Sequence, residues 1–142
     1  GRISDYAGTI YVRRENVNSR HAALQSLLDA VNTGKNIAIF PEGGCKGRRI
    51  QKEFHSGAFD ISLQTGVPVL PVFLQYVDQE TFEWANESLV TKLWQIFKSD
   101  NNIVNYFVHD AIFPDDFNDK GSYAEHVHSL YLAWQKEYLD AL

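Results

Sequence analysis

Residues 37–44 read IAIFPEGG. The first four residues are continuously apolar, which is typical of a strand buried on both faces of a parallel sheet. The proline, glutamate and two glycines that follow favour a turn, so this strand is predicted to end in a loop. In α/β proteins, ligands bind beyond the carboxyl ends of the strands. Residues 41–44 are therefore the first candidate for a binding site.

On either side of this stretch, predicted strands and helices alternate. The patterns predict strands in residues 8–12, 37–40, 67–76 and 103–113, and helices in residues 24–34, 54–65, 89–97 and 122–138, the last opened by a capping box that begins at Ser122. This alternation predicts an α/β fold with a mainly parallel sheet flanked by helices. We find no repeat or linker, so residues 1–142 are interpreted as one domain.

Length and composition narrow the class of protein. The chain has 142 residues, of which 44% are hydrophobic and 22% charged, as in one globular domain. A single cysteine, Cys45, excludes an internal disulfide or a cysteine-based zinc site and favours a reducing compartment. No apolar run approaches the ~20 residues that span a bilayer. Because the chain begins with Gly1 and contains no methionine, we interpret it as part of a longer protein.

Charge is distributed unevenly along the chain. The net charge is -5, yet residues 1–52 contain 9 basic and 4 acidic residues, whereas residues 53–142 contain 4 basic and 14 acidic ones. The basic residues of the first part include two clusters, at Arg13 and Arg14 and at residues 46–52. Local clusters of this kind attract anions whatever the net charge. An exposed, solvated face is the alternative interpretation.

Arg13 and Arg14 end a predicted strand. A guanidinium group can bind a phosphate or a carboxylate with two parallel hydrogen bonds, so an anion is expected nearby. For either arginine alone, an ion pair with Glu15 or Glu42 is an equally good interpretation. We expect Arg14 and the 46–52 cluster to converge on one pocket beside Glu42.

Several short blocks, in order along the chain, resemble those of a known family. Residues 8–14 (GTIYVRR) are similar to the block Gly-x-Ile-Phe-Ile-x-Arg, residues 40–43 (FPEG) to the start of Phe-Pro-Glu-Gly-Thr-Arg-Ser, and residues 67–72 (VPVLPV) to a later block. Residues 54–59 (FHSGAF) are similar to the family's Phe-Lys-x-Gly-Ala segment. The family is that of the glycerolipid acyltransferases, which includes glycerol-3-phosphate and lysophosphatidic acid acyltransferases. The similar blocks cover about half of the chain.

The resemblance implies transfer of a fatty acyl group from a coenzyme A or acyl-carrier-protein thioester to a glycerol-type hydroxyl. It implies that Arg14 grips the phosphate of a lysophospholipid-like acceptor, while Glu42 and Gly43 shape the acceptor site. Further anion-binding candidates are Arg13, Lys46, Arg48 and Arg49. We expect a glycerol-3-phosphate acyltransferase-like fold truncated at its N-terminus, no metal, no cofactor besides the thioester substrate and no nucleic-acid partner. A position on the cytoplasmic face of a membrane is also expected, either peripheral or anchored by a segment outside this chain.

The sequence departs from the family in two respects. The catalytic block of the family, His-x4-Asp, is expected to precede Gly8, outside this chain, so no residue of the chain is assigned a catalytic role. His55 and Asp60 have that spacing, but they follow the third block, and on a helix their side chains diverge. Where the family has Thr-Arg-Ser, the chain has Gly44, Cys45 and Lys46.

Some residues permit more than one interpretation. Cys45 is interpreted as a structural residue rather than a nucleophile. A group of aromatic residues has three alternative interpretations: lining an acyl tunnel, resting on a membrane or packing in the core. The group consists of Phe82, Trp84, Trp94 and Phe97, and their spacing favours the core. The rival to an acyltransferase is a non-catalytic module that binds anions or lipid headgroups.

Overall fold

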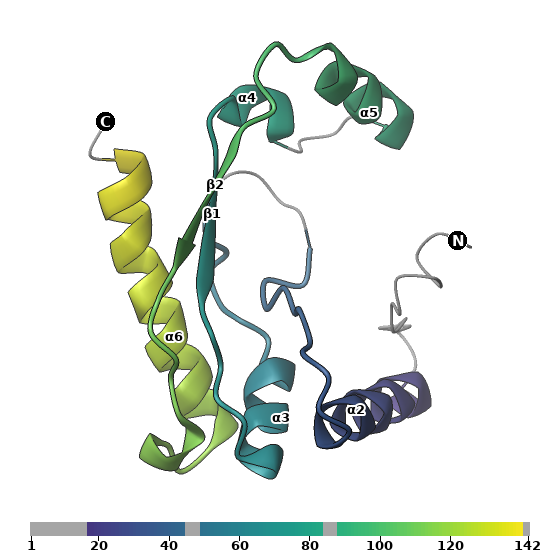
Figure 1. The fold of residues 1–142 in the computed structure, drawn as a ribbon, viewed down its shortest axis with the longest axis vertical. Coiled ribbons are helices and arrows are strands. Elements are labelled where there is room, and N and C mark those ends of the chain that lie inside the picture. Colours follow the sequence, from purple (N-terminus) through teal and green to yellow (C-terminus); the bar gives the residue numbers. More distant parts are fainter. Residues whose placement is uncertain (1–16, 45–48, 84–87, 141–142) are drawn as a thin grey trace.

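The computed structural model describes residues 17–44, 49–83 and 88–140 (Figure 1). The regular elements, in order, are α2 (Val17–Asn32), α3 (Gly57–Thr65), β1 (Val72–Tyr76), α4 (Gln79–Phe82), α5 (Leu89–Lys98), β2 (Val104–Val108) and α6 (Lys120–Gln135). A 3-10 turn, Pro114–Asp116, precedes α6, and a π-helical turn, Lys136–Asp140, follows it. None of the described helices is long and apolar enough to span a bilayer. The predicted strand at 8–12, with Arg13 and Arg14, lies outside the described residues.

The sheet of the described residues consists of two antiparallel strands. Val72 of β1 lies opposite Val108 of β2, and Tyr76 lies opposite Val104. An isolated bridge between Val69 and Ile112 extends the pairing. The predicted strand ranges 67–76 and 103–113 each contain a shorter strand, at 72–76 and 104–108, but the described residues do not form the mainly parallel sheet that was predicted. The physical reason is the connection: α4 and α5 lie beyond the end of β1 instead of crossing the sheet, so the chain re-enters at the same end (Figure 1).

Residues 37–40 differ from the prediction. They form no strand, and the side chain of Phe40 is 74% exposed. A strand requires a neighbour for its backbone hydrogen bonds. Within the described part of the chain, no segment pairs with residues 37–40, so they are not a strand there.

The predicted helices are present, with adjusted ends. Gly34 and Gly66, the predicted stops, have φ angles of +81° and +71°, as left-handed residues after a helix do. The capping box at Ser122 is wrong, because α6 begins two residues earlier. Asp119 is its N-cap, with Oδ1 accepting hydrogen bonds from the N–H groups of Gly121 at 2.7 Å and Ser122 at 3.0 Å.

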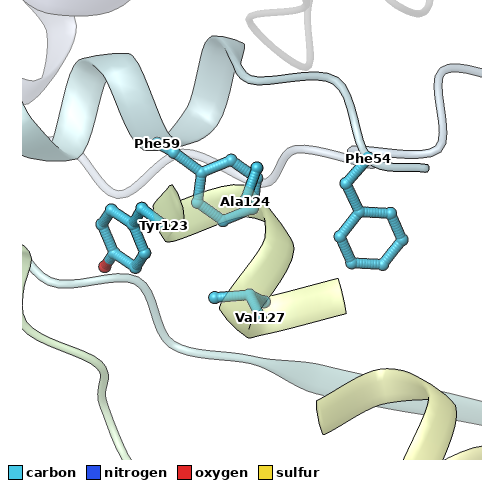
Figure 2. Close-up of a cluster of buried hydrophobic side chains, with 5 residues drawn as sticks. All are labelled: Phe54, Phe59, Tyr123, Ala124 and Val127. Atoms are coloured by element: carbon cyan, nitrogen blue, oxygen red, sulfur yellow. The ribbon is translucent and has the colours of Figure 1, made fainter. Parts of the chain in front are cut away.

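The main core lies between α3 and α6 (Figure 2). It consists of Phe54, Phe59, Tyr123, Ala124 and Val127. The hydroxyl of buried Tyr123 donates to the carbonyl of Ile112 at 2.6 Å, so its polar end is satisfied. This packing places the segment before α3, which holds the candidate site, against α6.

The aromatic residues predicted as core behave differently. Phe82 is half-buried and stacks on Tyr76 with ring centroids 4.7 Å apart. Trp94 and Phe97 are exposed, so the core interpretation is wrong for both. Helical spacing shows that they share a face, but it does not show which way the face points. Trp84 lies outside the described residues.

Candidate functional site

The stretch Phe40–Gly43 folds into a tight turn. The N–H of Gly43 donates to the carbonyl of Phe40 at 3.1 Å, which closes the turn. Pro41 occupies the second position, where its fixed φ angle is favourable. Gly43 has a φ of +70°, a conformation that side chains disfavour. The motif therefore presents Glu42 from a turn of defined geometry.

The His55 ring lies directly against Gly43. A Cβ atom at Gly43 would come within 2.4 Å of His55 Cδ2 and 2.6 Å of Nε2. The backbone N–H of His55 also donates to the carbonyl of Pro41 at 2.8 Å. Gly43 is thus required for a second reason, because the imidazole occupies the space that a side chain needs.

Glu42 is half-buried and held by the backbone. Its Oε2 accepts a hydrogen bond from the N–H of Gln51 at 3.2 Å. Burial raises the pKa of the Glu42 carboxyl, while the Gln51 hydrogen bond and the nearby His128 lower it, with burial the largest effect. A partly desolvated carboxylate interacts more strongly with a neighbouring donor than one in water does. It can accept a hydrogen bond from an acceptor substrate's hydroxyl or orient a cationic side chain.

Helix α6 anchors the segment that binds Glu42. His128 Nε2 donates to the carbonyl of Gln51 at 2.8 Å, and the N–H of Ile50 donates to Gln135 Oε1 at 2.7 Å. Arg49 forms an ion pair with Asp140, one turn beyond α6. Residues 49–51 thus lie along the C-terminal helix, which fixes the position of Glu42 through Gln51.

Sequence reasoning missed this anchor. His128 and Gln135 lie seven residues apart, which places them on one face of a helix, and that spacing was the available signal. Their partners lie 77 and 85 residues earlier in the chain. A single sequence does not reveal pairings at that distance.

The structure describes some of the predicted site residues. Glu42 and Gly43 are neighbours in one turn, and Arg49 is paired with Asp140. The other candidates, Arg13, Arg14, Lys46 and Arg48, lie outside the described residues, as does Cys45. Convergence of the basic residues on Glu42 stays a prediction.

His55 and Asp60 interact with different partners. The two oxygens of Asp60 accept hydrogen bonds from Gln64 at 3.0 Å and Lys120 at 2.9 Å. The bond from Lys120 is the main reason that the pKa of Asp60 is lowered. Asp60 therefore links α3 to α6, while the His55 ring lies over Gly43. Across the described ranges, no three His, Cys, Asp or Glu residues gather closely enough to hold a metal ion.

Comparison with known proteins gives the same relationship as the sequence blocks. The model of the family described as Acyltransferase matches residues 1–75, which include the Glu42 turn and all of α3 and reach into β1. This chain belongs to the acyltransferase family. Its resemblance to the glycerolipid acyltransferases is confirmed by the relatives that it matches.

Three relatives of this acyltransferase chain illustrate the similarity. A lysophosphatidylcholine acyltransferase of Drosophila melanogaster is 36% identical over 100 residues, which are 66% of this chain and 18% of the relative. A lyso-ornithine lipid O-acyltransferase of Pseudomonas aeruginosa is 34% identical over 76 residues, 54% of this chain and 29% of the relative. A 1-acyl-sn-glycerol-3-phosphate acyltransferase of Haemophilus influenzae is 35% identical over 66 residues, 46% of this chain and 28% of the relative.

The matches cover less than a third of each of these relatives, so this acyltransferase chain corresponds to part of their length. No solved structure gives a significant match to it.

Proposed function

We propose that this chain is the acceptor-binding part of an enzyme that transfers a fatty acyl group from a coenzyme A or acyl-carrier-protein thioester to a hydroxyl of a lysophospholipid or glycerol-phosphate-type acceptor. The observation that carries the proposal is the family match over residues 1–75, which includes the turn bearing Glu42 and Gly43. Three relatives are named as acyltransferases of related lipids.

In this reaction, the acceptor's hydroxyl oxygen forms a bond to the thioester carbonyl carbon and the carbon–sulfur bond breaks. A general base takes the hydroxyl proton, and the thiol leaves with a proton. We assign the base to a His-x4-Asp pair outside the 142 residues. Binding the anionic end of the acceptor near Glu42 places its hydroxyl for attack and reduces the entropic part of the barrier.

The basic residues supply the anion-binding half of this proposal. Arg14 would hold the acceptor's phosphate, with Arg13, Lys46, Arg48 and Arg49 contributing positive charge. Arg49 would contribute only by exchanging Asp140 for the substrate, because the two are paired in the structure. The sequence resemblance supports the role of Arg14. The hydrogen-bonded carboxylate of Glu42 supports the location of the acceptor site.

Three further features complete the proposal. The enzyme would act at the cytoplasmic face of a membrane, where its lipid acceptor lies, and the single cysteine is consistent with a reducing compartment. No cofactor besides the thioester substrate is required. In the complete domain, residues 8–12 and 37–40 would join a mainly parallel sheet, which would cover the exposed Phe40.

The test measures release of free coenzyme A from a long-chain acyl-CoA in the presence of a lysophospholipid. The 142-residue chain should show no transfer, whereas a longer natural chain that includes a His-x4-Asp pair should show it. A positioned base typically contributes about a hundredfold to ten-thousandfold in rate. Transfer by the short chain that His55→Ala abolishes would instead make His55 the base. Specific lysophospholipid binding without transfer by the longer chain would favour a binding module.

A further inference from the structure

Helix α5 has a concentrated apolar face. Ser88 caps the helix, its Oγ accepting a hydrogen bond from the N–H of Thr91 at 3.2 Å. Four of the large apolar side chains in this helix are exposed: Val90, Leu93, Trp94 and Phe97. At about 100° per residue, these positions lie within an arc of about 100°. The helix is therefore strongly amphipathic.

This helix is oriented with its apolar face outward. Val90, Trp94 and Phe97 are 76%, 63% and 79% exposed. A lysine of the helix is buried instead: Lys92 is 1% exposed, and its Nζ donates to the carbonyl of Thr81 in α4 at 3.2 Å. In surface helices of globular proteins the apolar stripe normally faces the core. The reversed orientation leaves the apolar face available to another surface.

The position of α5 is fixed by contacts with the rest of the molecule. At one side, Lys92 bonds α5 to α4, and Phe82 of α4 in turn stacks on Tyr76 of β1. At the other, Ser99 Oγ donates to Asp78 Oδ2 at 2.9 Å, which ties the end of α5 to the end of β1. In Figure 1, α4 and α5 lie at the opposite end of the molecule from α3. The apolar face is thus held beyond the end of the sheet.

The composition of this face indicates what it contacts. Helix α5 contains no acidic residue, in a chain whose net charge is -5, and of its two lysines Lys92 is buried, which leaves Lys98 beside the apolar face. Lys98 Nζ lies 5.1 Å from the centre of the Trp94 ring, at the edge of the apolar face. Aromatic and aliphatic residues with a flanking lysine are typical of helices that lie in the interface of a bilayer. The lysine is attracted to anionic headgroups.

We propose that α5 docks this chain on a phospholipid surface, with Val90, Leu93, Trp94 and Phe97 inserted among the lipids and Lys98 at headgroup level. The inference rests on the proposed function, which requires access to a lipid acceptor. The docking inference adds to that function by naming α5 as the surface that provides access to the lipid. Fully burying one large apolar side chain strengthens binding by about tenfold to a hundredfold, so a few such residues suffice for reversible docking.

The experiment is co-sedimentation of the 142-residue chain with vesicles made of equal amounts of phosphatidylcholine and phosphatidylserine. The chain should bind, and the double variant Val90→Ser/Phe97→Ser should bind on the order of a hundredfold more weakly, because it loses two insertions. The matched control is Val67→Ser/Leu70→Ser, which removes two exposed apolar side chains near the end of α3. It should bind as the unchanged chain does. Circular dichroism and thermal unfolding verify that both variants fold.

Two results would overturn the docking proposal. One is an equal loss of binding in the two double variants, which would show nonspecific adsorption. The other is the absence of vesicle binding together with a dimer that Val90→Ser/Phe97→Ser dissociates, which would make α5 a contact between copies of this chain. The vesicles contain neither lysophospholipid nor thioester, so vesicle binding is measured independently of acyl transfer. Docking without transfer in a longer chain would contradict the proposed function and leave the docking supported.

Discussion

Two features of Gly43 disfavour a side chain at this position: its positive φ angle and its close contact with the His55 ring. Gly43→Ala places a Cβ against the His55 ring at a φ of +70°. We expect a loss of about 1–3 kcal/mol in the free energy of unfolding, measured by denaturant titration. Gly44→Ala is the matched control, because a Cβ at Gly44 meets nothing within 4 Å. Adding His55→Ala to Gly43→Ala should recover the stability lost through steric contact, but not the stability lost through the positive φ angle. Equal stability of the two single variants would contradict the geometry of the turn.

Glu42 has a charge that its surroundings do not stabilise well. Its pKa is raised, chiefly by burial, so the folded state binds its proton more tightly than the unfolded state does. The stability of the native chain should therefore fall as pH rises from the ordinary value of 4.5 through the raised value. Glu42→Gln should remove this pH dependence and leave the free energy of unfolding at pH 7 unchanged or higher.

The same Glu42→Gln substitution should lower acyl transfer in a longer chain that carries the His-x4-Asp pair. A carboxylate whose charged form is disfavoured by burial is typical of a functional site. Parallel denaturation and coenzyme A release assays measure the two effects. Full activity of Glu42→Gln, or a large loss of stability at pH 7, would show that the carboxylate has a structural role.

At the scale of elements, Tyr131 links α6 to β1. Its hydroxyl accepts a hydrogen bond from the N–H of Val72 at 3.1 Å and donates to the carbonyl of Val72 at 3.0 Å. Tyr131→Phe leaves both part-buried backbone groups without this partner, so we expect a loss of about 1–3 kcal/mol in unfolding free energy. The exposed Tyr106→Phe is the control and should change stability by less than about 0.5 kcal/mol. Hydrogen exchange should show faster exchange at Val72 in the Tyr131 variant alone.

The elements also show which features a sequence reveals. Helices α2, α3, α5 and α6 could be predicted because apolar spacing and terminal glycines are local signals. The pairing of β1 with β2 could not, since it depends on where the chain goes after Tyr76. The start of α6 was misplaced because Asp119 and Ser122 are both good caps, and the carboxylate of Asp119 binds the N–H groups. The outward face of α5 depends on its packing against α4 through Lys92, which periodicity does not encode.

At the scale of the whole molecule, the candidate site also combines features that the sequence reveals with features that it does not. The turn with Glu42 and Gly43 was found from its residue types, because a short motif records a local geometry. The hydrogen bond from His128 to Gln51 joins residues 77 apart, and nothing in either neighbourhood indicates the other. The family match reaches residue 75, whereas the helix that anchors the site begins at Lys120. Part of the chain outside the matched region thus helps to hold the family's motif in place.

The balance of buried and exposed apolar residues predicts how the isolated chain unfolds. Within the described ranges, large hydrophobic side chains on α5, β2 and the loop before Pro41 are exposed, and the main core is formed by α3, α6 and Phe54 just before α3. The heat capacity of unfolding increases with the apolar surface that unfolding exposes. A compact chain of this length has a value of about 1.7–2.1 kcal/mol/K. We expect calorimetry to give a lower value, because side chains such as Phe97 are exposed before unfolding.

Phe97→Ser should leave that heat capacity nearly unchanged, whereas Phe59→Ala, which removes a buried ring, should cost about 3–5 kcal/mol in stability. A heat capacity in the ordinary range would mean that the apolar face of α5 is covered within the chain itself, and its docking on lipid would then be contradicted too.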